Sequence, residues 1–187
     1  MSLYPVLLHL EVAFRNSVHQ ALTNFAGTAT WYDVTPSLLD RREQEEVKAT
    51  RRELVKQRQK QGQATALIAD DMVAALKFGF WTGLLNKPYE QVLWHKGNML
   101  ALAFPHLPRR ARTRPGISKR MHQIRQLRNR VFHHEPIWHW RDLLQQHREL
   151  RETLAWFEPT LIGLLPDTHT FDEVYARGAT AHELDVR

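Results

Sequence analysis

The sequence predicts an all-α protein. Apolar residues recur at spacings of three and four in several separate segments, and glycines and prolines divide these segments from one another. No stretch shows the apolar–polar alternation of β-strands in series. A chain of 187 residues suits one domain that buries roughly 70% of its unfolded surface. We therefore expect a single helical domain over residues 1–177 and a flexible tail over residues 178–187.

The first expected helix ends near Gly27 and has one apolar stripe. The stripe consists of Leu3, Val6, Leu7, Leu10, Phe14, Val18, Leu22 and Phe25. Glu11 and Arg15 lie four residues apart on its more polar side. They either form an ordinary surface ion pair, worth about 0.2–0.5 kcal/mol, or support the site described below. For the nearby His19 we favour a place on this solvated face.

A long charged helix is expected next. Thr35 is a suitable N-cap, with Pro36 at the first helical position. The run Ser37–Gln61 is rich in Arg, Lys, Glu and Gln and has few apolar positions. Such a helix is mostly exposed, so we expect a helical bundle with a long charged helix or hairpin extension.

Three further helices complete the expected bundle around the motif helix. They cover Thr65–Leu85, Tyr89–Ala103 and about Arg141–Phe157. The segment Phe78–Leu85 is close to hydrophobic all round, which indicates burial. Ser118 is a candidate cap for the motif helix.

A proline-interrupted basic loop, Phe104–Gly116, leads into the motif helix. The chain has 26 Lys and Arg against 20 Asp and Glu and a net charge of +6 at pH 7. This charge favours polyanions, with nucleic acid as the first candidate, although it also serves solubility. The candidate RNA-binding residues are Arg109, Arg110, Arg112, Arg114, Lys119, Arg120 and Arg125.

Composition excludes several classes of chemistry. The chain has no cysteine, so it has no disulfide, thiolate metal cluster or cysteine nucleophile. Its N-terminus lacks the basic and apolar regions of a signal peptide, and no apolar run approaches the ~18 residues of a membrane span. We expect a cytoplasmic protein without a membrane partner.

The densest group of chemically versatile side chains is the segment Arg125–Pro136. Arg128 is followed by Asn129 and, five positions after the arginine, by His133. An arginine offers a planar fork of donors that matches a phosphate, and a histidine exchanges a proton near neutral pH. These groups suffice to break RNA without a metal, since a base can activate the 2′-hydroxyl while an acid protonates the leaving 5′-oxygen. DNA lacks that nucleophile.

The helical spacing of these groups favours a dimer. At 100° per residue, Arg128 lies beside the buried stripe while His133 points well away from it. Two copies of the helix about a two-fold axis would bring both residues of each chain into one cleft, with Phe132 sealing the contact.

The neighbouring His134 and Glu135 have supporting roles at most, either orienting the imidazole or ending the helix. A metal hydrolase built from His133, His134, Glu135 and His139 is the weaker alternative. The spacing of these residues does not match a helical i,i+4 pair, and the chain has no H-E-x-x-H motif. We therefore expect no metal and no other cofactor.

The segment L-R-N-R-V-F-H-H-E-P-I, Leu127–Ile137, resembles the signature of the abortive-infection (Abi-like) branch of the HEPN superfamily. Further similar segments are L-E-V-A-F-R-N (Leu10–Asn16), F-G-F-W-T-G-L-L (Phe78–Leu85), Leu93-Trp94 and Ala103–Pro105. The resemblance implies a dimeric helical bundle and a metal-independent endoribonuclease, with Arg128 and His133 catalytic and Asn129 supporting. It also implies a toxin or phage-defence role, sometimes beside an antitoxin. Some members of that superfamily bind RNA or nucleotides without cutting, which leaves a non-catalytic binding module as the alternative.

Overall fold

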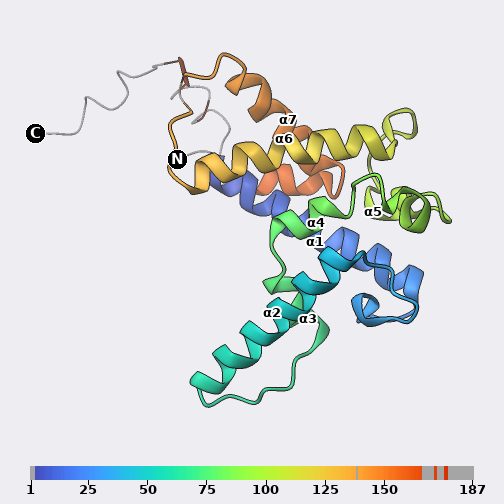
Figure 1. Cartoon of the computed structure of the whole chain (residues 1–187). Coiled ribbons are helices and arrows are strands. Elements are labelled where there is room, and N and C mark those ends of the chain that lie inside the picture. The colour runs from blue at the N-terminus through green and yellow to red at the C-terminus, as the bar shows by residue number, and fades with distance from the viewer. Residues whose placement is uncertain (1–2, 138, 166–170, 172–174, 177–187) are drawn as a thin grey trace, which may run out of the picture.

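The computed structural model describes residues 3–137, 139–165, 171 and 175–176. Every regular element in these ranges is a helix, which confirms the all-α class (Figure 1). The α-helices are α1 (Leu3–Ala26), α2 (Arg41–Lys60), α3 (Ala69–Ala75), α4 (Phe78–Gly83), α5 (Met99–Ala103), α6 (Arg114–Phe132) and α7 (Leu143–Ala155). Shorter helical turns are η1 (Trp31–Asp33), η2 (Glu90–Trp94), η3 (Arg109–Ala111) and η4 (Pro159–Leu164). The expected tail over residues 178–187 lies outside the described residues.

Helix α1 is the central element of the bundle and packs against α3, α4, α5, α6 and α7. Its predicted apolar stripe is buried from Leu3 to Leu22. The ring of Phe14 lies 5.9, 6.2 and 6.0 Å from the rings of Phe78, Phe104 and Phe157. The helix ends at Gly27, as predicted. That glycine has a left-handed φ of 71°, and its N–H donates to the carbonyl of Thr23 at 2.9 Å.

Helix α2 projects from the body as an arm (Figure 1). It begins at Arg41, so the prediction of an N-cap at Thr35 is wrong. The hydroxyl of Ser37 accepts the N–H of Leu39 at 3.1 Å, and this local turn delays the helix. The buried side chain of Leu39 then anchors the turn in the core.

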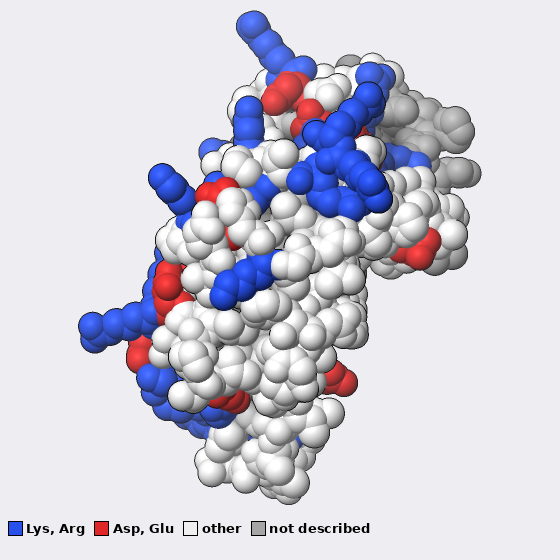
Figure 2. All heavy atoms as spheres, turned by 90° about the vertical axis from the view of Figure 1, so that its right-hand side faces the viewer, with Lys and Arg blue, Asp and Glu red and all other residues white. Residues whose placement is uncertain are grey.

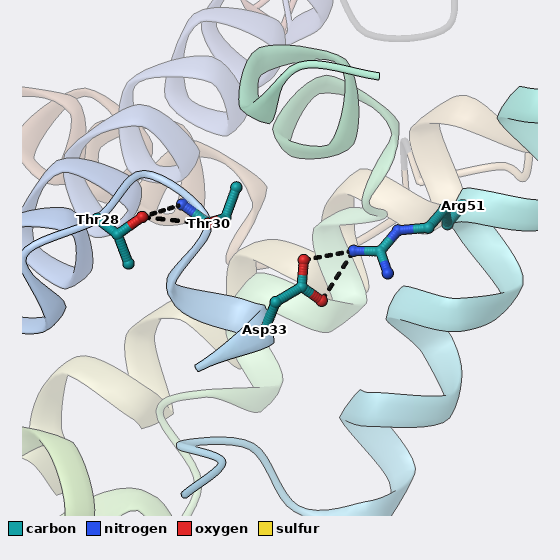
Figure 3. A network of polar contacts seen from close by, with 4 residues as sticks. All are labelled: Thr28, Thr30, Asp33 and Arg51. Carbon is teal, nitrogen blue, oxygen red and sulfur yellow. Dashed lines mark hydrogen bonds and ion pairs between the residues drawn. The ribbon is translucent and has the colours of Figure 1, made fainter. Parts of the chain in front are cut away.

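Two polar contacts fix the arm to the body. Figure 3 shows Nη2 of Arg51 on α2 donating to both carboxylate oxygens of Asp33 on η1, at 2.8 and 2.6 Å. Nearer the body, the buried Glu43 accepts the hydroxyl of Tyr89 at 2.9 Å. Burial raises the pKa of Tyr89, with the hydrogen bond to Glu43 adding to the effect, so this phenol stays protonated and keeps donating.

The other predicted helices are shorter or begin elsewhere. The expected helix Thr65–Leu85 is divided at Leu76, whose ψ of 128° places it in an extended conformation between α3 and α4. The break lets Trp81 donate its indole N–H to the Leu76 carbonyl at 3.3 Å while both side chains are buried. The expected helix Tyr89–Ala103 is likewise divided at Gly97, which has a φ of 55°.

Helix α6 begins four residues before Ser118. Thr113 is its N-cap and accepts the N–H of Gly116 at 3.3 Å, with Pro115 in the first turn. The prediction of a cap at Ser118 is therefore wrong, because the preceding threonine and proline already provide the start signal. Within the described residues, no helix has the length and apolarity that crossing a bilayer requires.

Candidate functional site

The motif helix α6 is held against α1 by its buried stripe and by polar contacts at one end. Ile117, Met121, Ile124, Leu127 and Val131 are the buried residues of α6. The two helices run in opposite directions, since the start of α1 lies beside the end of α6 (Figure 1). There the hydroxyl of Tyr4 donates to the Val131 carbonyl at 3.1 Å, and the rings of Tyr4 and Phe132 lie 4.9 Å apart. This contact fixes the end of α6 that carries the motif.

Arg128 is held from two sides. Its Nε donates to Oε2 of Glu11 at 3.1 Å, with the two side chains 25% and 20% exposed. Its guanidinium carbon lies 4.3 Å from the ring centroid of Phe132, close enough for a cation–π contact. Its Nη1 also donates to Oδ1 of Asn129 at 3.4 Å. The guanidinium is therefore fixed in orientation while part of it still faces solvent.

Glu11 and Arg15 do not pair with each other among the described contacts. Glu11 bonds to Arg128, whereas Arg15 donates to Asn16 Oδ1 at 3.3 Å and to the carbonyl of Ala74 at 3.4 Å. Glu11 therefore contacts Arg128, as expected if it supports the site and does not form a surface ion pair with Arg15. Arg15 instead joins α1 to α3.

The two histidines lie at the exposed end of α6, where the chain closes a Schellman motif. The N–H of His134 donates to the Val131 carbonyl at 3.2 Å, and that of Glu135 donates to the Arg130 carbonyl at 2.9 Å. His134 has a left-handed φ of 56°. The Glu135 carboxylate pairs with Arg130 at 2.9 Å, so it stabilises the helix end.

A groove of about 1180 Å³ runs between the arm and the body. The charged residues that line it are Glu11, Arg42, Glu46, Glu53, Lys77, Arg125 and Arg128, and Asn129 is among its polar residues. Burial raises the pKa of Glu46, although the neighbouring Arg42 and Lys77 act in the opposite direction. Arg125 donates to the hydroxyl of Thr82 at 3.3 Å on the body side. His133 does not line the groove.

One chain therefore brings Arg128, Asn129, Arg125 and Glu11 together but leaves the imidazole of His133 outside. The arm residues that line the groove were not predicted from the sequence, because their charged pattern indicates only a solvated helix. A signal was present, because Arg42, Glu46, Thr50, Glu53 and Gln57 recur at spacings of three and four and form one face.

The predicted RNA-binding residues separate into two groups. Four of the arginines contact the protein itself. Arg125 donates to Thr82 as described above, Arg112 donates to the Leu107 carbonyl at 2.6 Å, and Arg114 donates to the Leu85 carbonyl at 2.9 Å. Arg120 lies 3.2 Å from the carboxylate of Glu149. These four side chains are half-buried and stabilise the fold.

Arg109, Arg110 and Lys119 form the other group and are exposed. Each lacks a carboxylate partner in the part of the chain that the structure describes. They lie on η3 and in the first turns of α6. Figure 2 shows Lys and Arg side chains gathered on the upper part of the face, where Figure 1 places this end of α6.

Within the described ranges, no three His, Asp or Glu side chains lie close enough together to hold a metal ion. Comparison of the chain with models of protein families, with curated proteins and with solved structures found no match.

Proposed function

We propose that the protein is a metal-independent endoribonuclease that acts as a homodimer, with Arg128 and His133 catalytic and Asn129 supporting. The observation that carries this proposal is the state of Arg128. Its guanidinium is oriented by Glu11 and Phe132, is partly exposed, and lies little more than one helical turn from the exposed His133. A pre-oriented cation stabilises developing charge better than a mobile one, because it need not reorganise during the reaction.

In the proposed reaction, one His133 removes the proton of a ribose 2′-hydroxyl, and O2′ attacks the adjacent phosphorus. The P–O5′ bond breaks as O5′ receives a proton from the second His133 of the pair. The products are a 2′,3′-cyclic phosphate and a 5′-hydroxyl. Arg128 stabilises the charge on the non-bridging oxygens, and Asn129 donates to one of them or positions the imidazole.

Two chains are needed because the catalytic groups diverge within one chain. Arg128 and His133 are five residues apart, which separates their directions by about 140° around the helix axis. His133 also lies outside the groove that Arg128 lines. A second copy facing α6 supplies the missing imidazole.

The resemblance of the motif to Abi-like HEPN proteins extends this proposal to biology. It suggests a cytoplasmic toxin or phage-defence nuclease, with RNA as the substrate and an antitoxin or another defence protein as a second partner.

A non-catalytic module that binds RNA, a nucleotide or a protein is the second candidate. The observation in its favour is that Arg128 already pairs with Glu11 in one chain, while none of the imidazoles in the described ranges lines the groove. Such a chain would grip a phosphate without a group to move the proton. It would show salt-sensitive binding and no cleavage product.

Cleavage of mixed cellular RNA in excess chelator tests the proposal. We expect the parent protein to produce ends with a 2′,3′-cyclic phosphate and His133→Ala to lose about 10²-fold or more of the rate. His9→Ala is the matched control, since it removes an exposed histidine of α1. Full activity of a folded His133→Ala protein would contradict the proposal. Binding without cleavage by the parent would favour the binding module.

A further inference from the structure

The exposed cations Arg109, Arg110 and Lys119 are distant from the proposed catalytic groups. Lys119 is fourteen residues before His133 on one helix, which places their backbones about 21 Å apart at 1.5 Å per residue. Arg109 and Arg110 come before Arg114, the first residue of α6. Arg114 is itself nineteen positions before His133, which corresponds to about 28 Å along the helix. The unpaired positive charge and the exposed imidazole therefore lie at opposite ends of α6.

A polar strip joins these two ends along the solvent side of α6. Its members are Lys119, His122, Gln126, Asn129 and His133, which alternate at spacings of three and four and are exposed or half-buried. Helix α6 contains no Asp or Glu. Nothing within the helix therefore repels a phosphate backbone along this strip. Gln126 and Asn129 of the strip also line the groove on its α6 side, whereas Glu46 and Glu53 line it from the arm. A polyanion is therefore expected to follow α6 and not the arm.

We infer that Arg109, Arg110 and Lys119 form a second anchor for RNA, the basic anchor, and that the backbone follows the polar strip from this anchor to His133. This inference rests on the proposed function for the cut, but the binding it describes does not need cleavage. A stacked strand advances about 3.4 Å per nucleotide, so 21–28 Å corresponds to roughly six to eight nucleotides. The substrate class is therefore an RNA with at least about six nucleotides on one side of the cut, and not a dinucleotide or a free nucleotide.

Binding of single-stranded 2′-O-methyl RNA tests the inference, since a blocked 2′-hydroxyl cannot attack the phosphate. Full-length protein is titrated with oligonucleotides of 4, 8, 12 and 16 residues at 50 and 200 mM salt, with fluorescence anisotropy as the readout. The test variant is Arg109→Gln/Arg110→Gln/Lys119→Gln. The matched control is Arg52→Gln/Lys56→Gln/Lys60→Gln, which removes the same charge from exposed residues of the arm.

We expect the test variant to bind the 4-residue oligonucleotide like the parent and to lose affinity for the 12-residue one. Three phosphate contacts account for a salt slope of about −2. Between the two salt concentrations, the parent's affinity for the 12-residue oligonucleotide should thus fall about 20-fold more than the variant's. The arm variant should keep the length dependence of the parent.

Three results would overturn the inference. The first is an equal loss of affinity in the two triple variants. The second is an equal loss of affinity for short and long RNA in the test variant. The third is full retention by the test variant of the parent's affinity for long RNA. The last result would be found if these cations served an acidic protein partner instead. Failure of the proposed function would look different, because unmodified RNA would then stay intact while the length-dependent binding persisted.

Discussion

At the scale of single residues, His134 occupies a position that most chains give to glycine. It is the left-handed residue that closes α6, with a φ of 56°. A side chain at such a position costs about 1–3 kcal/mol of backbone strain, although histidine tolerates it better than most residues. The motif therefore retains an imidazole beside His133 at some expense in stability.

Replacing His134 with glycine should stabilise the folded chain. The strain disappears, while the greater freedom of glycine in the unfolded state offsets part of the gain. We expect the free energy of unfolding to rise by about 0.5–1 kcal/mol in urea denaturation.

The reverse substitution, Gly27→Ala, is the control for this prediction. Gly27 closes α1 with a φ of 71°, and an added Cβ would meet no atom within 4 Å. Its effect is therefore purely conformational, and we expect a loss of about 1 kcal/mol. A His134→Gly protein less stable than the parent would show that the His134 side chain makes a stabilising contact.

At the scale of elements, α1 positions most of what surrounds it. It supplies Glu11 to the site and also holds η1, because the indole N–H of Trp31 donates to Nδ1 of His19 at 3.0 Å. The indole nitrogen can only donate, so this His19 nitrogen must be unprotonated. The sequence indicates a solvated face for His19, whereas the structure half-buries it against Trp31.

The contact between α1 and η1 should make stability depend on pH. Burial lowers the pKa of His19 below its usual 6.5, with Asp70 opposing the effect. The unfolded chain therefore binds a proton more readily, so the stabilisation is complete above pH 6.5 and is lost as the pH falls through the folded-state pKa.

The difference between the parent and His19→Gln measures this dependence. We expect the free energy of unfolding of the parent to fall more steeply between pH 7 and pH 5 than that of the variant. Only the difference between the two profiles is informative, because contributions common to both proteins cancel in it. Parallel pH profiles would contradict the role of His19.

The arm is the element whose role the sequence least reveals. Its return segment is held by Arg58, which donates to the carbonyls of Ala64 and Ala66 and, at 2.6 Å, to the carboxylate of Asp71. Together with the contacts of Arg51 and Glu43, this fixes the face of α2 that lines the groove. The arm is thus a supported wall of the site as well as a solvated helix.

At the scale of the whole molecule, the proposed active site is complete only in a pair of chains. Arg128 of one copy would act with His133 of the other, because the two groups point apart within each copy. This arrangement is a property of the assembly and can be tested without a structure of the dimer.

Mixing parent chains with an equal amount of His133→Ala chains should lower cleavage by more than simple dilution. A mixed dimer keeps only one of the two His133 imidazoles that the proposed reaction uses. Random exchange would leave about a quarter of the dimers with both imidazoles, so about a quarter of the parent activity is expected, against about half if each chain acted alone. The measurement is RNA cleavage after the two proteins are unfolded together and refolded. Half of the parent activity, with both proteins dimeric, would contradict a site shared in this way.

Much of the fold could be predicted from the sequence, because helical periodicity is a local property. The apolar stripe of α1, its end at Gly27 and the exposed character of α2 all follow from the spacing of residues along a helix. Where residues are apolar all round, as in Phe78–Leu85, spacing no longer indicates direction. The predicted long helix is divided just before this segment, at Leu76, by packing that periodicity does not reveal.

The motif around Arg128 and His133 and the excess of positive charge were determined by the sequence alone. Only the tertiary structure decided which charged side chains have partners within the fold. It paired Glu11 with Arg128 across 117 positions of chain, and it engaged Arg112, Arg114 and Arg120 in the fold. A charge's partner depends on how helices pack, and an unpaired cation has the same letter in the sequence as a paired one. The exposed Arg109, Arg110 and Lys119 could therefore be distinguished only once the chain was folded.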